Sequence, residues 1–447
     1  MLAIDIKNGT SPSVDPQVNN PRLRNAFINP KGEIQLLPNI VQEFELDNTR
    51  AIFKSTFNDR SIVVTQREVF YIQGGALIKV GEIISTTNAV RISENTQNQV
   101  TIVNGAGAWV FAQRTGGFSR LNATNNGFTL TNPVDVTVLN TITIIVGKDD
   151  DQWIISEPDN ALFYDANFIQ VIDNSMGKLT GCEDLNNNLF IFGETGVQRW
   201  IPSIERQTTE APFSQDPTYR DDYGCLSTGS LITDNNQLFY LSQNGEIRMM
   251  TPQGRSTVST DGIEQIIANY TDPSNSFGSY YFHKGFYLYQ LSFPDEGNAF
   301  VYCPWSKKWS ESDEIWLGFD GKVILSDGVY GLTTSFEGNY KTVVIQSGYF
   351  RPEPQKMYER TILGSILLEA TQGKGTNPIE QICFLQLSKD NIVYGNRVRR
   401  KLSKVGDRLF QFRWYMSYSN NGFSVRFTLE LQQDITILNA WAIMATE

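Results

Sequence analysis

Short apolar runs separated by polar turns set the pattern of this chain, and Asn235–Gly254 shows it most clearly. An apolar run, Gln237–Leu241, meets a turn at Asn244-Gly245, and a second run, Glu246–Thr251, follows. Two β-prone runs joined by Asn-Gly are the strongest short-range hairpin signal, because Asn and Gly adopt the positive φ of a tight hairpin turn. This stretch therefore predicts two paired antiparallel strands.

The same pattern recurs along the chain from about Arg50 onward. The apolar centres lie roughly 37 to 49 residues apart, which is the spacing expected for units that are each a four-stranded propeller blade. A propeller is favoured over a long sandwich because regular repetition protects the edges of short sheets. Six or seven blades are predicted, with the first near Ser61–Ile84 and later ones near Val110, Trp153, Phe190, Phe239, Tyr287 and Tyr330.

Changes in this pattern divide the chain into three parts. Residues 1–48 are rich in Asn and Pro and lack periodicity, which predicts an extended arm lying on a surface. Residues 49–350 hold the repeats and form the predicted propeller. Residues 351–447 begin with two prolines and continue with longer, more apolar strands, which predicts a C-terminal β-sandwich-like domain. The predicted fold class is therefore all-β.

Two segments depart from the hairpin rhythm. Pro202–Cys225 is long, polar and contains proline, so we expect an exposed excursion from a blade. Gly262–Thr271 instead follows a helix-capping candidate, Asp261, and carries three isoleucines at helical spacing. It predicts one short helix packed by its apolar face, formed by Ile263, Ile266 and Ile267.

Composition agrees with an all-β chain and excludes several classes of protein. The 447 residues include 27 Phe, 18 Tyr and 35 Gly, which suit pleated strands and tight turns. A formal net charge of −11 argues against a general nucleic-acid coat, which needs a basic face. We expect no membrane span, because no run of about 18 apolar residues occurs. We also expect no export signal, so the separated cysteines should be buried free thiols: Cys182, Cys225, Cys303 and Cys383.

Residues that could carry chemistry are few. The single histidine, His283, cannot by itself supply a His-rich zinc site, and we expect it to have a structural or surface role. Lys148–Asp151 and Asp184–Asn188 resemble calcium loops but lack the glycine and glutamate of that motif, so we expect turns. In Ser388–Gly395, Asp390 is expected to bond nearby backbone N–H groups in a tight turn. We predict no enzyme activity, catalytic residue, cofactor or metal site.

Positive charge gathers in Arg397–Arg413, against a lone Asp407. Arg397, Arg399 and Lys401 would share one face of a strand, because side chains alternate with a period of two. The stretch fits a strand edge guarded by charge, a docking face for an acidic protein partner, or a contact with passing DNA. The predicted docking residues are Arg397, Arg399, Arg400, Lys401, Lys404 and Arg408.

Several segments together resemble the tail-accessory, or packaged-DNA stabilisation, proteins of P22-like short-tailed bacteriophages. Asn25–Ile40 (NAFINPKGEIQLLPNI) is similar to the opening of that family, with its Leu/Phe-Pro-x-Ile step. FGETGVQRW, within Asn188–Pro202, is similar to its phenylalanine-glycine strand pair, and GIEQIIANYT resembles its helix. SKDNIVYGNRV, a basic run and RLFQFRWYMS match its terminal domain in order and character.

The resemblance implies a structural virion protein made in the host cytoplasm. It implies a hexameric ring below the portal and its adaptor ring that extends the DNA channel. It also implies a needle or plug that retains the DNA, and flanks to which tailspikes or fibres attach. An acidic channel wall would offer passing phosphates few cations to bind. Two other functions stay open: a glycan-binding or glycoside-cleaving propeller, suggested by aromatic turns and acidic loops, and a cellular interaction scaffold.

Overall fold

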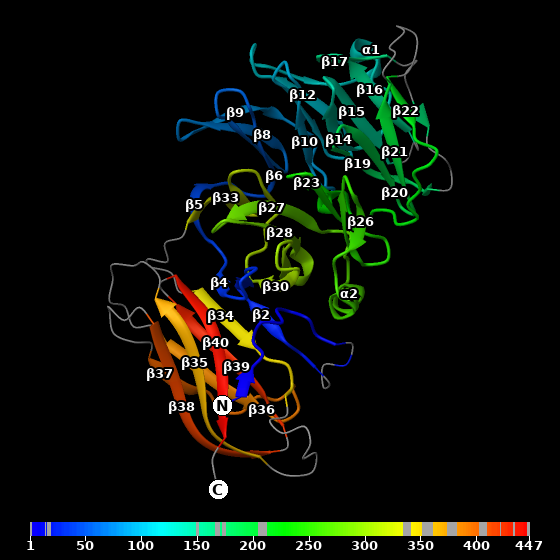
Figure 1. The fold of residues 1–447 in the computed structure, drawn as a ribbon. Helices are drawn as coiled ribbons and strands as arrows, with labels where there is room; N and C mark the ends of the chain where they lie inside the picture. Colours follow the sequence, from blue (N-terminus) through cyan, green and yellow to red (C-terminus); the bar gives the residue numbers. More distant parts are fainter. Residues whose placement is uncertain are drawn as a thin grey trace.

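The computed structural model describes residues 2–13, 15, 19–148, 152–165, 170–171, 176–203, 212–333, 341–350, 361–372, 382–401, 409–420, 422–431 and 434–444. These residues form a propeller at one end of the molecule and a β-sandwich at the other (Figure 1). The predicted all-β fold class is confirmed.

The propeller has seven blades in the described part of the chain, each built on four antiparallel strands. Blade 1 consists of β6 (Thr49–Lys54), β7 (Ser61–Thr65), β8 (Glu68–Gln73) and β9 (Ala76–Glu82). Blade 2 consists of β10 (Arg91–Glu94), β11 (Gln99–Val103), β12 (Ala108–Ala112) and β13 (Gly117–Arg120). Blade 3 consists of β14 (Pro133–Leu139), β15 (Ile142–Gly147), β16 (Gln152–Glu157) and β17 (Asn160–Tyr164), with β18 (Gln170–Val171) also paired to β16. Blade 4 consists of β19 (Leu179–Leu185), β20 (Asn188–Gly193), β21 (Val197–Pro202) and β22 (Phe213–Gln215).

The other three blades complete the ring. Blade 5 consists of β23 (Ile232–Asp234), β24 (Gln237–Leu241), β25 (Ile247–Thr251) and β26 (Gly254–Thr257). Blade 6 consists of β27 (Phe277–His283), β28 (Phe286–Phe293), β29 (Asn298–Cys303) and β30 (Lys308–Ser312). Blade 7 consists of β31 (Gly318–Phe319), β32 (Val323–Leu325), β33 (Gly328–Thr333) and β5 (Asn39–Glu45). Because β5 precedes blade 1 in sequence, its pairing with β33 closes the ring.

Apolar side chains at the blade interfaces hold the ring together. Strand alternation gives each blade two apolar faces, and a separate buried cluster fills the space between each pair of neighbouring blades. The cluster between blades 5 and 6 contains Phe239, Tyr289 and Trp309. The cluster between blades 7 and 1 joins Ile324 to Val63, so no interface in the circle lacks an apolar core.

The sandwich buries one continuous core between two sheets. One sheet contains β1 (Leu2–Ile4), β3 (Ala26–Ile28), β4 (Ile34–Leu36), β35 (Thr361–Gln372), β38 (Leu409–Asn420) and β40 (Ile435–Met444). The other contains β2 (Arg22–Arg24), β34 (Lys341–Gln346), β39 (Ser424–Leu431), β36 (Ile382–Ser388) and β37 (Val398–Lys401), in that spatial order. The C-terminal strands β35, β36, β38, β39 and β40 are 7 to 12 residues long, as the sequence pattern indicates.

One sheet passes from the propeller into the sandwich. β2 pairs in parallel with β30 of blade 6 and antiparallel with β34. Arg22 Nη1 lies 2.6 Å from Glu311 Oε1, and Arg24 pairs with Asp313, so ion pairs cross the same seam. The two domains therefore share backbone hydrogen bonds, which makes this junction stiffer than a flexible linker.

The strands divide the chain differently from the bounds expected from sequence. Within residues 1–48, β1 to β4 belong to the sandwich and β5 belongs to blade 7, so this segment is built into both domains. β34, inside the range 49–350, lies in the sandwich. β3 and β4 pair with each other, but β1, β2, β4 and β5 also pair with strands hundreds of residues away, and local pattern carries no information about those partners.

The two departures from the hairpin rhythm have separate outcomes. Within Pro202–Cys225, residues 204–211 lie outside the described residues, but β22 pairs with β21 as the fourth strand of blade 4. That part is not an excursion, because buried Phe213 packs into the cluster between blades 3 and 4. The helix is confirmed as α2 (Asp261–Ala268), which buries Ile263 and Ile267. Thr260, not Asp261, stands at the N-cap position, and its side chain makes no capping hydrogen bond. A second helix, α1 (Ala123–Asn126), is one turn long.

Candidate functional sites

The basic stretch begins on an exposed edge strand. β37 is the last strand of its sheet, and all four of its residues are exposed. Arg399 pairs with Phe384 and Lys401 pairs with Ile382, whereas Arg400 pairs with buried Cys383. Arg397 Cζ lies 5.7 Å from the Phe384 ring centre. Arg397, Arg399 and Lys401 therefore share the outward face, as the period of two predicts.

Arg400 differs from its neighbours because it points toward the sandwich edge. Its Nε donates to the Arg413 carbonyl oxygen of β38 at 3.4 Å. Trp414 Nε1, on the same strand, donates to the Val398 carbonyl oxygen at 3.0 Å. These two contacts join β37 to β38 of the other sandwich sheet. Of the other predicted docking residues, Lys404 and Arg408 lie outside the described residues.

The centre of the propeller holds a cavity that the sequence did not indicate. Its volume is about 450 Å³, and its lining comes from the innermost strand of every blade. Four carboxylates lie in this lining: Glu183, Asp184, Asp234 and Asp320. Each of these four carboxylates accepts a hydrogen bond from another group of the protein.

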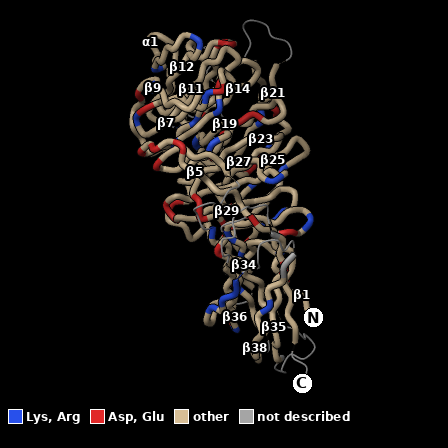
Figure 2. Tube along the Cα trace, turned by 90° about the vertical axis from the view of Figure 1, so that its left-hand side faces the viewer, with Lys and Arg blue, Asp and Glu red and all other residues tan. Residues whose placement is uncertain are grey.

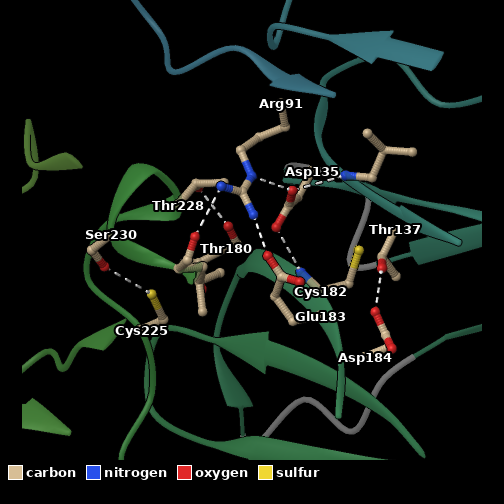
Figure 3. Close-up of polar contacts among 12 residues, drawn as sticks. Arg91, Asp135, Thr137, Thr180, Cys182, Glu183, Asp184, Cys225, Thr228 and Ser230 are labelled. Carbon is tan, nitrogen blue, oxygen red and sulfur yellow. Dashed lines mark hydrogen bonds and ion pairs between the residues drawn. The ribbon is translucent and has the colours of Figure 1, made fainter. Parts of the chain in front are cut away.

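Arg91 connects the innermost strands beside this cavity (Figure 3). Its Nε lies 2.7 Å from Asp135 Oδ1, its Nη2 pairs with Glu183, and its Nη1 donates to the Leu231 carbonyl oxygen at 2.9 Å. Asp135 Oδ2 also accepts from the Cys182 backbone N–H at 2.9 Å. One side chain of blade 2 therefore joins blades 3, 4 and 5.

Burial sets the electrostatics of this cluster. It raises the pKa of the Asp135 and Glu183 carboxyls, and the Arg91 guanidinium opposes that rise. Burial also disfavours the Arg91 charge, but the two carboxylates outweigh it and raise the pKa of Arg91 above its ordinary value. The arrangement is that of a buried ion-pair network whose members depend on one another. Across the described residues, no group of three or more His, Cys, Asp or Glu side chains is placed to hold a metal ion.

The sequence carries a signal for this cluster. Arg91, Asp135 and Glu183 each lie in the first strand of a repeat, next to an apolar position. A charged residue in the innermost strand of a buried blade needs a partner, since an unpaired buried charge is costly. Three such residues of mixed sign in successive repeats predict a shared ion-pair network.

His283 lies at the seam between propeller and sandwich. It is buried, and its Nε2 donates to the Leu36 carbonyl oxygen at 3.0 Å. The Phe27 ring packs edge-on at 6.0 Å, and Lys284 beside it pairs with Asp434 of the sandwich at 2.5 Å. Burial, and then the charge of Lys284, lower the pKa of His283 to about 4. These contacts agree with the structural role expected for His283.

Acid should therefore weaken the seam. The unfolded chain binds a proton on His283 near its ordinary pKa, whereas the folded chain resists protonation until about pH 4. Stability should fall by roughly 2–3 kcal/mol as the pH drops from about 6.5 to about 4. In His283→Gln, urea unfolding should lose this part of the pH dependence, measured as the difference from wild type between these pH values. An unchanged pH slope in the variant would contradict the assignment.

Of the turn predicted at Lys148–Asp151, residues 149–151 lie outside the described residues, and the other candidates lie as expected. Asn186 and Asn187, between β19 and β20, have positive φ and form a tight turn. Asp390 Oδ1 accepts from the Val393 and Ile392 backbone N–H groups at 2.8 and 3.0 Å, as predicted. The four cysteines are free and buried. Within the part of the chain that the structure describes, no helix is long and apolar enough to span a membrane.

Comparison with known families matches most of this architecture. Residues 31–311, from β4 through most of blade 6, match the family described as bacteriophage P22 Gp10, β-propeller. The chain belongs to this phage structural family. The family region includes the cavity lining from blades 1 to 6, and it ends before β31 of blade 7 and before β37. No curated protein matches the chain.

Solved structures with similar shapes share little sequence identity with this chain. The extracellular domain of a one-component system from B. thetaiotaomicron aligns at 12% identity and TM-score 0.46, covering 93% of this chain and 62% of that one. A chain of the mitotic checkpoint complex aligns at 11% sequence identity and TM-score 0.44, and the alignment covers 66% of this chain and 95% of that one. PorZ of Porphyromonas gingivalis aligns at 9% sequence identity and TM-score 0.40, and the alignment covers 73% of this chain and 44% of that one. This chain thus spans about three-fifths of the first of these structures.

Proposed function

We propose that the protein is a tail component of a short-tailed phage virion, in which copies form a hexameric ring below the portal and its adaptor ring. The ring closes the head, extends the DNA channel, and anchors a needle or plug and the tailspikes or fibres. The observation that carries the proposal is the match to the P22 Gp10 family over residues 31–311. Membership of a phage structural family also supports the proposal that the protein is located in the virion.

The build of the chain suits this role. Seven blades with an apolar core at every interface, and a sheet continuous with the sandwich, give a stiff block. The central cavity of about 450 Å³ matches small-molecule dimensions, so a duplex does not fit through one propeller. In the proposal, DNA therefore passes through the opening between several copies.

The first experiment tests the protein's presence in the particle. Purified virions should contain this chain in a fixed ratio to the portal protein, measured by quantitative mass spectrometry with the portal as internal standard. Phage particles that are assembled without this chain should lose their DNA after packaging. Intact, infectious particles without the chain would contradict the proposal. Turnover of a host polysaccharide by the purified protein would favour the glycoside-cleaving alternative instead.

A further inference from the structure

The centre of the propeller holds more carboxylates than cations. Among the described residues that line the central cavity, Arg91 is the only lysine or arginine, against four carboxylates. Buried Asp135 pairs with the same arginine. Figure 2 shows charged positions of both signs inside the propeller, around β14 and β19. Because a buried charge without its own counter-ion is costly, this excess favours a carboxyl that keeps its proton. The four lining carboxylates are Glu183, Asp184, Asp234 and Asp320.

Hydrogen bonds identify Asp135 as the charged partner of Arg91. Its Oδ1 accepts from Arg91 Nε at 2.7 Å and from the Val136 backbone N–H at 2.9 Å. Its Oδ2 accepts from the Cys182 backbone N–H at 2.9 Å. A proton on either oxygen would weaken one of these bonds, because a carboxylate oxygen is a stronger acceptor than a hydroxyl oxygen. Both oxygens of Asp135 are therefore used as those of a carboxylate.

Glu183 has one carboxyl oxygen that makes no hydrogen bond with the described residues. Its Oε1 accepts from Arg91 Nη2, whereas Oε2 has no such partner (Figure 3). The side chain is 13% exposed and lines the cavity, next to Asp184 of the same strand. A proton on Oε2 would leave the bond between Oε1 and Arg91 in place and would remove the repulsion between Glu183 and Asp184. Glu183 can therefore be neutral without losing a hydrogen bond.

The electrostatics of the cluster agree with this geometry. Burial raises the pKa of the Glu183 carboxyl to about 8. The Arg91 guanidinium opposes this rise, and the charges of Asp135 and Asp184 add to it. An ordinary glutamate has a pKa of about 4.3, so the cluster holds a proton that the unfolded chain releases. Burial also raises the pKa of the two thiols that face the cluster, which therefore stay neutral: Cys182 and Cys225.

We propose that Glu183 holds a proton at neutral pH and releases it in alkaline solution, so that the joint between blades 2, 3 and 4 is sensitive to pH. With the proton in place, Arg91 and Asp135 form a neutral pair, and Glu183 adds a hydrogen bond from blade 4. Without it, two carboxylates compete for one guanidinium, and Asp184 repels the second of them. Alkaline solution should therefore loosen the centre of the propeller. This inference does not depend on the proposed function.

The test compares the urea unfolding of wild type and Glu183→Gln over a range of pH. The folded chain keeps a proton up to about pH 8 that the unfolded chain releases near pH 4.5, so wild-type stability falls as the pH rises between these values. Relative to Glu183→Gln, the wild-type unfolding constant should rise about tenfold for each pH unit between about 5.5 and about 7.5. His283 and the other acids are present in both proteins, so their titrations cancel in this ratio. Equal pH slopes for the two proteins would overturn the proposal.

Two further variants locate the proton. At about pH 5.5, Glu183→Gln should change the unfolding constant less than about threefold, because glutamine resembles the protonated carboxyl. Asp135→Asn should raise it more than about tenfold, because an amide N–H then replaces an oxygen that accepts a hydrogen bond. The reverse order would place the proton on Asp135 and contradict the assignment. The matched control, Glu68→Gln, removes an exposed carboxylate paired with Lys79 and should keep the wild-type pH slope. Loss of the slope in this control would count against Glu183.

Infrared spectroscopy observes the proton without unfolding the protein. The difference spectrum of wild type between about pH 6.5 and about pH 9, which bracket the pKa of Glu183, should show the loss of a protonated carboxyl band. Glu183→Gln should lack this band. Wild type without a protonated carboxyl band at the lower pH would refute the proposal, even where the variant does not fold. The same band in Glu183→Gln would assign the proton to another carboxyl and would also refute it.

Discussion

Arg91→Met should lower the free energy of unfolding by about 3–5 kcal/mol, because it leaves buried Asp135 and Glu183 without their cation. The same change removes the hydrogen bond to the Leu231 carbonyl oxygen, which joins blade 5 to the network. Methionine keeps most of the side-chain volume, so the loss reports charge and hydrogen bonding more than packing. Chemical denaturation followed by tryptophan fluorescence measures it.

Two variants serve as controls for this prediction. Arg114→Met removes an exposed arginine that bonds Asn98, and should cost under about 1 kcal/mol. Adding Asp135→Asn and Glu183→Gln to Arg91→Met should recover much of the lost stability, since no buried charge is then unpaired. A loss below about 1 kcal/mol for Arg91→Met would show that the network does not hold the blades together.

Phe239→Ala should cost about 3–5 kcal/mol by opening the cluster between blades 5 and 6. Phe239 is fully buried, and its ring stacks on Tyr289 at 4.4 Å and on Tyr280 at 5.6 Å. The substitution removes the ring from both contacts and leaves a cavity that close-packed neighbours fill only in part. The measurement is again the unfolding free energy.

Phe282→Ala is the matched control, with the same chemical change on the same pair of blades. Phe282 is 57% exposed at the end of β27, so its loss should change stability by under about 1 kcal/mol. Equal losses for the two variants would contradict the blade assignment, because an exposed ring and a core ring would then contribute alike.

Local pattern was enough to predict the parts of the fold that depend on near neighbours. The Asn-Gly hairpin at Asn244-Gly245, the isoleucine face of α2 and the Asp390 turn all lie as expected. Each is set by residues within a few positions, through turn chemistry or helical period. Repetition of such units then indicated a propeller.

Long-range pairing was not predictable in the same way. β5 closes blade 7, and β2 joins the propeller to the sandwich, through partners nearly 300 residues away. These strands are short, and their sequences are compatible with many partners. The Arg91 network was missed for a related reason, since its members come from separate blades and meet only when the ring forms.

The most direct test of the account is an electron cryo-microscopy map of the phage tail. The account predicts a ring of six copies below the portal and its adaptor ring, each with seven blades and a sandwich, surrounding the DNA path. A map in which this chain is absent from the tail, or lies outside any ring around the DNA, would contradict it.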